Sequence, residues 1–294
     1  MGPEKKRWGD RKDGWQVKSL DAFCKFVPFV METRNDANNL FMEQLDIAAA
    51  EKYIREKREQ GLAGFGMLHI FIAAYVRTVS QRPWINRFVA GHRIYARRKI
   101  EISLAVKKEM SSDSEESTIK MVFEPTDTAV DVYNKLAASV EDYRREGGSE
   151  DNKTLKTANM LTKMPRPILR VAMRFIKWLD YHGWLPQSLL DASPFHASLF
   201  ISNLASLGIP PVYHHLYNFG NIPVFVTFGA KRKELALDAD GSVKEKRVID
   251  FTVVTDERIC DGFYYARAFK MFKQFMRKPE VLDLPPEKVE EDLR

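Results

Sequence analysis

The pattern of apolar and polar positions along this chain predicts strands separated by helices. Residues 40–46 alternate apolar and polar side chains, and residues 224–228 form a short apolar run. Such patterns are typical of half-buried and fully buried strands, respectively. Further strands are expected over 95–106, 118–123, 198–203 and 247–254.

Helical periodicity appears between these runs. Residues 48–58 are rich in Ala, Glu, Lys and Arg, residues 67–80 are mostly apolar, and residues 129–145 follow a 3.6-residue period. Pro83 ends the second of these helices. Strands with helices between them predict a two-layer α/β sandwich with a mixed sheet in one domain, residues 17–278. A basic arm (1–16) and an acidic tail (279–294) are expected to flank it.

The segment around residues 251–263 carries the strongest candidate chemistry. The apolar run 251–255 predicts a buried strand, Asp256, Glu257 and Arg258 form a polar turn after it, and a helix begins near Phe263. Ionisable side chains at the exit of a buried strand are well placed to hold a functional group on a rigid frame. The alternative is a salt-bridged corner with no chemistry.

Composition narrows the class of protein. Among 294 residues, 46 basic side chains face 40 acidic ones, and this mild, dispersed excess does not predict nucleic-acid binding. Cys24 and Cys260 are the two cysteines, so neither a zinc site nor a disulfide framework is expected, and no other metal site is predicted. The N-terminus lacks the apolar core of a secretory signal, which favours a cytoplasmic location.

Residues 256–262 read DERICDG, which resembles the His-x-x-x-Asp-Gly signature of the chloramphenicol acetyltransferase-like superfamily. This superfamily includes the catalytic domains of dihydrolipoyl acyltransferases. Glu257 stands where the family has its catalytic histidine. Three further blocks resemble family segments in the same order: RPWIN at 82–86, KIEISLAV at 99–106 and FISNL at 200–204.

The resemblance implies a stand-alone acyltransferase catalytic domain that forms a homotrimer and, in some relatives, a larger assembly. It implies an active site between adjacent subunits, where an acyl-coenzyme A and an acyl acceptor meet. The expected activity is transfer of an acyl group from the thioester to an unidentified acceptor. The alternative is a catalytically inactive trimeric scaffold or acyl-coenzyme A-binding pseudoenzyme.

Glu257 is a poorer base than the histidine it replaces. Proton transfer from a thiol with a pKa near 8.5 costs about 6 kcal/mol with a carboxylate near 4.3, and about 3 kcal/mol with an imidazole near 6.5. Burial of the carboxyl group would narrow that difference. Glu257 is therefore one candidate base.

His214 and His215, beside Tyr213, are the other candidates for the base. They lie in a loop between two expected strands, and the resemblance implies that this loop borders the substrate channel, with Tyr213 contacting substrate. Adjacent loop residues usually point apart, so one imidazole at most would serve. The alternative is a histidine held by a loop carbonyl.

Ser198 and Ser202 are expected on one face of a strand, because four residues separate them. Either could match the hydroxyl that stabilises the oxyanion in the family, or both could bond within the sheet. Asn203 is a further substrate-binding candidate.

Asp261 matches a structural aspartate of the family that pairs with an arginine. Arg34 and Arg258 are the expected partners. Gly262 next to it is expected to meet a requirement of the backbone near the substrate.

Residues 165–185 depart from the family pattern. Arg166, Arg170, Arg174 and Lys177 recur on one helical face, with apolar residues over much of the remainder. We favour a cover helix with its basic face in solvent. Contact with an anionic membrane surface and a lid for a fatty acyl chain are the alternatives.

Overall fold

The computed structural model describes residues 7–107, 116–145, 162–237 and 240–294. A six-stranded mixed sheet, in the order β2-β9-β8-β7-β5-β6, is the centre of the fold. Its strands are β2 (Asn38–Asp46), β5 (Ile100–Lys107), β6 (Glu116–Phe123), β7 (Leu199–Asn203), β8 (Val224–Leu237) and β9 (Val243–Asp256). β7 runs parallel to both β5 and β8, and the other pairs are antiparallel. The predicted mixed sheet is confirmed.

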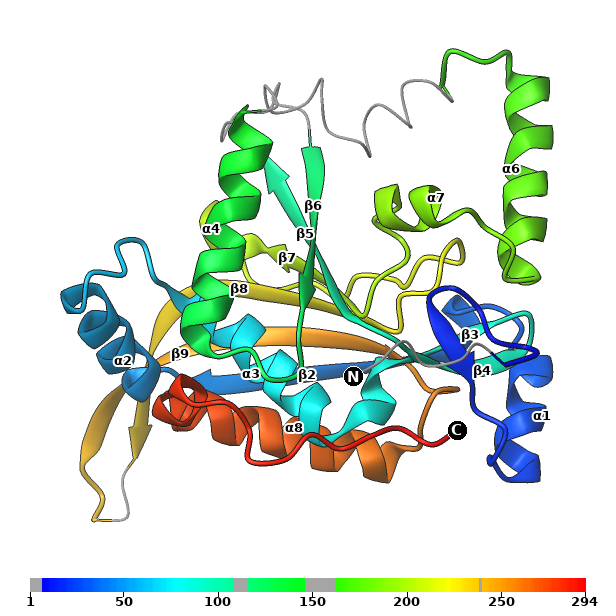
Figure 1. Ribbon diagram of the computed structural model, residues 1–294. Helices are drawn as coiled ribbons and strands as arrows, with labels where there is room; N and C mark the ends of the chain where they lie inside the picture. The colour runs from blue at the N-terminus through cyan, green and yellow to red at the C-terminus, as the bar shows by residue number, and fades with distance from the viewer. Residues whose placement is uncertain (1–6, 108–115, 146–161, 238–239) are drawn as a thin grey trace.

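Helices cover one face of this sheet (Figure 1). Two of them, α3 and α8, lie side by side below it, and α4 packs against α3 and β6. The helices of this layer are α2 (Ala48–Glu59), α3 (Met67–Gln81), α4 (Ala129–Arg145) and α8 (Gly262–Arg277). The two-layer α/β arrangement expected from the sequence is therefore present.

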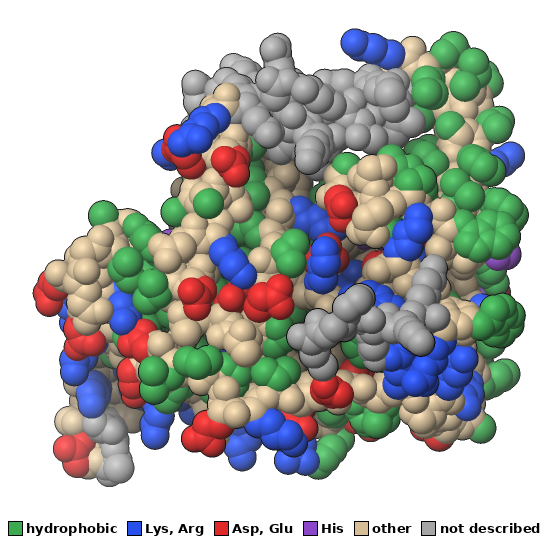
Figure 2. Space-filling view, viewed as in Figure 1, with side chains coloured by type: hydrophobic (Ala, Val, Ile, Leu, Met, Phe, Trp, Pro, Cys, Tyr) green, Lys and Arg blue, Asp and Glu red, His purple; other side chains and the backbone are tan. Residues whose placement is uncertain are grey.

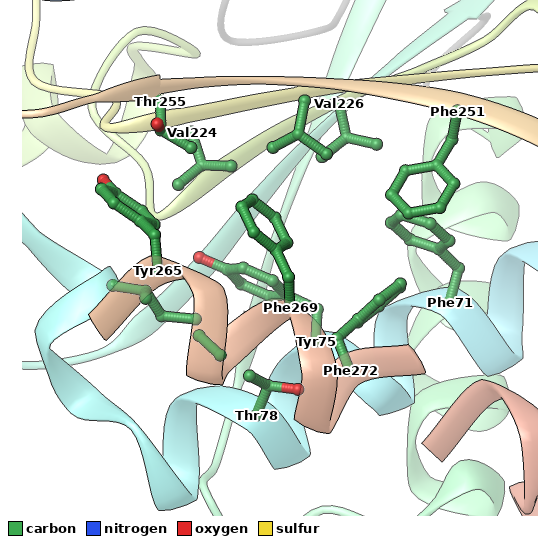
Figure 3. Close-up of a pocket in the computed structure, with 13 residues that line it drawn as sticks. Phe71, Tyr75, Thr78, Val224, Val226, Phe251, Thr255, Tyr265, Phe269 and Phe272 are labelled. Carbon is green, nitrogen blue, oxygen red and sulfur yellow. The ribbon is translucent and has the colours of Figure 1, made fainter. Parts of the chain in front are cut away.

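The core between the two layers is aromatic. Phe71 of α3 and Phe272 of α8 contact each other with ring centroids 4.8 Å apart, and Phe71 also meets Phe228 of β8 at 5.6 Å. Rings from both helices point toward β8 and β9 in the close-up of Figure 3. They leave a cavity of about 40 Å³, which can hold only a few water molecules and no acyl chain.

A second, three-stranded sheet has the order β1-β4-β3. It consists of β1 (Gly14–Gln16), β3 (Arg87–Ala90) and β4 (Arg93–Arg97). The sequence predicted one strand over 95–106, and this is wrong. The chain breaks at Arg98 and Lys99, so that β4 pairs in the small sheet while β5 enters the large one. The break depends on which strands the two halves pair with, and the apolar pattern of one strand carries no information about its partners.

The remaining elements lie around the two sheets. They are α1 (Ala22–Val30), α6 (Arg166–Tyr181), α7 (Gln187–Ala192) and the 3₁₀ turns η1 (Asn35–Ala37), η2 (Pro83–Asn86), η3 (Leu204–Leu207) and η4 (Pro279–Asp283). In Figure 1, α6 stands at the upper right edge of the molecule and α1 at the lower right. Residues 108–115, between β5 and β6, lie outside the described residues.

The C-terminal segment lies along the helical layer. The carboxylate of Asp292 accepts hydrogen bonds from Nε and Nη2 of Arg87, and both side chains are buried. The amide of Glu290 donates to the carbonyl of Ser80 at 2.8 Å. The end of the described chain is thus anchored to α3 and β3 by backbone and charged contacts.

Candidate active site

The turn after β9 is built on a buried ion pair. Arg258 donates from Nε to one oxygen of Asp256 at 2.8 Å and from Nη2 to the other at 2.7 Å. The exposed fraction of Asp256 is 0% and that of Arg258 is 4%. The side chain between them, Glu257, is exposed. The first and third residues of the Asp-Glu-Arg triplet therefore form the scaffold, and the middle residue points to solvent.

Three further contacts hold this turn in place. The amide of Glu257 donates to the carbonyl of Ala37 at 2.9 Å, and the hydroxyl of Tyr265 donates to the carbonyl of Asp256 at 2.9 Å. Nε of Arg34 lies 4.0 Å from the Asp256 carboxylate. Burial lowers the pKa of Arg34 to about 10, and the negative charge of Asp256 opposes that shift. Arg34 remains a cation at neutral pH, so Asp256 has two cationic neighbours.

The arginine pairing expected for Asp261 is wrong. Arg34 and Arg258 both contact Asp256. Asp261 instead caps α8, where its carboxylate accepts from the amide of Tyr264 at 2.7 Å. Asp256, the last residue of β9, is fully buried, so its carboxylate requires charged partners in place of solvent, whereas Asp261 is exposed.

Gly262 does not meet a backbone requirement within the chain, contrary to expectation. It is the first residue of α8, its φ is not in the left-handed region, and no heavy atom from outside its own helical turn and chain neighbours lies within 4 Å of where a Cβ would stand. A contact of Gly262 with substrate stays a prediction.

The histidine loop, residues 212–220, packs on the sheet face away from α3 and α8. Thr227 Oγ1 lies 2.7 Å from the carbonyl of Val212, and Thr252 Oγ1 donates to the same carbonyl at 2.6 Å. Neighbouring positions on these strands, Val226 and Val253, line the cavity under the helices. Since side chains alternate along a strand, the histidine loop and the helices lie on opposite faces.

His214 is half-buried in a stack of rings. Its imidazole lies 3.9 Å from the Phe225 ring, centroid to centroid, and 4.6 Å from that of His215. Burial lowers the pKa of His214 below its usual 6.5, and the positive charge of His215 lowers it further, while the hydrogen bond to the His215 carbonyl opposes the shift. His214 is therefore neutral at pH 7.

The contact that holds His214 also defines its tautomer. Nδ1 of His214 lies 2.8 Å from the backbone carbonyl of His215. A carbonyl oxygen only accepts, so Nδ1 carries the hydrogen and Nε2 has a free lone pair. His215 and Tyr213 are exposed. His214 thus has the protonation state of a general base.

The histidine loop and the Asp256 turn are linked through Arg34. The Arg34 guanidinium donates to the carbonyl of Asn218 at 3.3 Å, and the amide of Asn35 donates to the Asn218 side chain at 3.2 Å. Gly220 closes the loop with φ +84°, and a Cβ there would lie 2.1 Å from the carbonyl oxygen of Phe195. The loop can follow this path only with glycine at position 220.

The two candidate serines differ in accessibility. Ser198 is fully buried just before β7, and its Oγ accepts from the amide of Glu101 at 2.9 Å. Ser202, in β7, is half-exposed, and its hydroxyl makes no hydrogen bond within the described parts of the chain. Asn203 uses its side-chain oxygen to cap the amide of Ala205 at 3.1 Å. Of the three side chains, Ser202 alone has a hydroxyl available to a substrate.

Strand register separates Ser202 from Glu257 within one chain. Ser202 pairs with Thr227, which pairs with Thr252. Asp256 is four residues further along β9, about 13 Å at the usual rise per residue. Ser202 also lies two strands away from β9. Glu257 and Ser202 of the same subunit therefore cannot act on the same atom.

For Arg34, the sequence predicted Asp261 as the partner, whereas the structure pairs it with Asp256. The sequence did contain a signal for Asp256 as the partner, because Asp256 directly follows a run of buried strand residues and a buried carboxylate needs a counter-ion. Within the described segments, no group of three or more His, Cys, Asp or Glu side chains is arranged to bind a metal ion.

Neither the protein-family models nor the curated proteins contain a match to this chain. Solved structures do resemble it. A probable dihydrolipoamide acetyltransferase from Listeria monocytogenes has a TM-score of 0.55 at 14% identity, over 92% of this chain and 95% of that one.

Two further structures are similar over almost their whole length. Dihydrolipoamide acetyltransferase of Azotobacter vinelandii, studied for the roles of a serine, a histidine and an asparagine in its catalytic mechanism, has a TM-score of 0.54 at 13% identity, over 96% of this chain and 99% of that one. The cubic core of the pyruvate dehydrogenase multienzyme complex has a TM-score of 0.52 at 12% identity, with the same two coverages. This chain therefore has the fold of the dihydrolipoamide acetyltransferase catalytic domains, as the four sequence blocks predicted.

Proposed function

We propose that this protein transfers an acyl group from an acyl-coenzyme A to a thiol or hydroxyl acceptor, with His214 as the general base. The observation that carries this proposal is the hydrogen bond from His214 Nδ1 to the His215 carbonyl, which leaves Nε2 as a proton acceptor. A lowered pKa and a stacked, half-buried ring support the same role.

The reaction has two proton transfers. Nε2 of His214 takes the proton of the acceptor thiol, and the sulfur attacks the thioester carbonyl. The hydroxyl of Ser202 donates to the oxyanion of the tetrahedral intermediate. Collapse of the intermediate breaks the bond to the coenzyme A sulfur, which leaves with the proton returned by the imidazolium. In the net reaction, the acceptor gains the acyl group and loses a proton, and coenzyme A gains that proton.

Glu257 joins this site from the neighbouring subunit. Ser202 and His214 lie on the same sheet face, whereas Glu257 stands at the end of β9, too far from Ser202 in one chain. In a trimer the Glu257 carboxylate of one subunit approaches His214 of the next and stabilises its imidazolium. The cubic core structure supports three-fold association, because a cube has three-fold axes at its corners. Direct proton abstraction by Glu257 is the alternative route.

Two free thiols, Cys24 and Cys260, are compatible with a reducing compartment, so we place the reaction in the cytoplasm.

The second candidate function is an acyl-coenzyme A-binding scaffold without catalysis. Glu257 favours it, because the signature position carries a carboxylate in place of the expected imidazole. Assembly would survive in a scaffold, and acyl transfer would not.

Calorimetric titration with coenzyme A, acetyl-coenzyme A and longer thioesters is the first test. Saturable binding near one ligand per chain is expected, and no binding at millimolar concentrations would overturn both candidate functions. Transfer is then measured with acetyl-coenzyme A and dihydrolipoamide, the acceptor named for the similar enzymes, followed by a thiol and alcohol screen. His214→Ala should abolish transfer and His182→Ala, at an exposed imidazole, should not. Binding without transfer to any acceptor would leave the scaffold.

Intersubunit complementation tests the shared site. His214→Ala and Glu257→Gln homotrimers are each expected to be inactive. Co-expressed one to one, random mixed trimers should recover about a quarter of the wild-type sites, because a site then needs His214 from one subunit and Glu257 from the next. Recovery would be zero if both side chains came from one chain.

A further inference from the structure

Helix α6 buries only one side against the rest of the protein. Its partly buried positions recur on one face and are Leu169, Ala172, Met173, Ile176 and Leu179. An adjacent face is apolar but exposed, at spacings of three, four and three residues. Its members and their exposed fractions are Ile168 (56%), Val171 (65%), Phe175 (57%) and Trp178 (48%). A cover helix, as the sequence favoured, accounts for the first face and leaves the second without a partner among the described residues.

The exposed apolar face continues from α6 to α1. Trp178 stacks on Phe175 with ring centroids 5.9 Å apart and meets Trp184 at 5.3 Å. At the last residue of α6, the Tyr181 hydroxyl bonds to His92 Nδ1 at 2.9 Å. His92 stacks on Phe29 of α1, centroid to centroid at 4.7 Å.

On α1 this surface ends in further exposed apolar side chains, at Phe23, Phe26 and Val30. Figure 2 shows hydrophobic side chains along the right edge of the molecule from α6 down toward α1, with a histidine between them. We call this surface, from Ile168 to Phe23, the aromatic band.

Asp180 fixes the orientation of α6 and therefore of the aromatic band. Its carboxylate accepts from Arg11 Nη2 at 2.7 Å and lies 3.3 Å from Nε2 of His196. Arg11 also donates to the Asp180 backbone carbonyl. Gly91 allows the same end of α6 to come close, since a Cβ there would lie 2.5 Å from the carbonyl oxygen of Tyr181. These contacts set the direction of α6 at its C-terminal end and thereby place the exposed face.

The exposed charges of α6 are all positive. Asp180 is its one acidic residue and is buried. The basic side chains form a row beside the exposed apolar face, at Arg166, Arg170, Arg174 and Lys177.

A groove of about 390 Å³ between α1 and β4 has the same charge. Lys18, Lys25 and Arg93 line it, with no carboxylate among its lining residues. Acidic side chains in this region, Asp21 and Glu32, lie at the two ends of α1. The surface around the aromatic band therefore complements an anionic partner.

We propose that the aromatic band docks this protein on the surface of an anionic lipid bilayer. Exposed Trp, Tyr and Phe beside a row of Arg and Lys are the features by which helices lie in the interface of a membrane. The contact is with one leaflet, since none of the described helices has the length and apolarity to cross a bilayer. A two-fold pair of copies fits less well, because such a pair formed through this face would bring the two basic rows together.

Flotation with lipid vesicles tests this proposal. The vesicles contain phosphatidylcholine alone or phosphatidylcholine with about 30 mol% phosphatidylserine, which makes the surface strongly anionic. The full chain should float with the anionic vesicles and not with the neutral ones. Arg170→Gln with Arg174→Gln should weaken binding roughly thirtyfold, at about 1 kcal/mol for each cation near the surface. Phe175→Ser with Trp178→Ser should weaken it about tenfold or more, because the two rings supply the apolar contact.

The matched charge control is Lys246→Gln with Lys270→Gln, two exposed lysines on β9 and α8, and it should bind as the wild type. Leu235→Ser with Leu237→Ser, exposed on β8, is the apolar control. Brominated lipid should quench tryptophan fluorescence in the wild type and less in Trp178→Phe. No flotation of the wild type at physiological salt, or equal weakening by the controls, overturns the proposal. So does a change of oligomeric mass by light scattering in the band variants, which would make the band a contact between copies.

Discussion

Replacement of Arg258 by methionine should destabilise the protein strongly, because it leaves a buried carboxylate without its main partner. Asp256 has no exposed surface, and its carboxylate accepts two hydrogen bonds from the Arg258 guanidinium. Arg34, the second cation, lies 4.0 Å away. Loss of one member of such a buried pair costs about 3–5 kcal/mol. Methionine keeps much of the side-chain volume, so a cavity adds little to this cost.

A double-mutant cycle separates the ion pair from other effects. Asp256→Asn removes the buried charge, and with Arg258→Met it removes both members of the pair. The double variant should be less destabilised than the sum of the two single variants, with a coupling energy of roughly 2–3 kcal/mol. The measurement is urea unfolding of all four proteins at one chain concentration, followed by tryptophan fluorescence and by circular dichroism.

Two outcomes would refute this reasoning. If Arg258→Met cost less than about 1 kcal/mol, the pair would behave as a surface salt bridge does. If the cycle were additive, Asp256 and Arg258 would not depend on each other. The exposed Glu257 supplies the internal control, since Glu257→Gln changes the same turn without a buried charge and should shift stability by less than about 0.5 kcal/mol.

Three further results are expected. Acyl transfer should fall as the pH drops through the lowered pKa of His214, so the acidic limb of the kcat/KM profile should lie below pH 6.5. The free energy of unfolding should also decrease as the pH drops through 6.5, because His214 of the unfolded chain takes up a proton at a higher pH than His214 of the folded protein. Gly220→Ala should cost about 2–4 kcal/mol by thermal or urea unfolding, because its Cβ meets the Phe195 carbonyl, whereas Gly241→Ala, with φ +82° and open space, should cost only about 1 kcal/mol. Asp292→Asn should cost about 3 kcal/mol and expose the C-terminal segment to limited proteolysis, because the buried guanidinium on β3 loses its partner. Wild-type protection in that last assay would contradict the anchoring role.

Local patterns in the sequence were sufficient for most elements. The helix expected over 129–145 is α4, with the same bounds, and the expected helix over 67–80 is α3 with one more residue. Each of these elements follows from periodicity and from glycine or proline at its ends, which act over a few residues. The fold followed as well, since four short blocks in the right order resembled one family.

Strand partners and strand ends depended on tertiary structure. β8 and β9 continue as a paired hairpin far beyond the apolar runs that predicted them, through a stretch that includes the pairs Lys233 with Arg247 and Glu234 with Lys246. Tertiary structure also decided which candidate side chains of the site are accessible. Ser198 and Ser202 have the same side chain and the same strand parity, and only packing makes one buried and the other available.

The sequence determined which side chains of this protein are candidates, because residue type and order are local properties. Only the tertiary structure decided that Asp256, and not Asp261, holds Arg34 and Arg258. Likewise, it decided that His214 donates from Nδ1 and that one face of α6 stays exposed. The physical reason is that charge pairing, tautomer and exposure depend on what lies around a side chain, and segments distant in the sequence supply those surroundings.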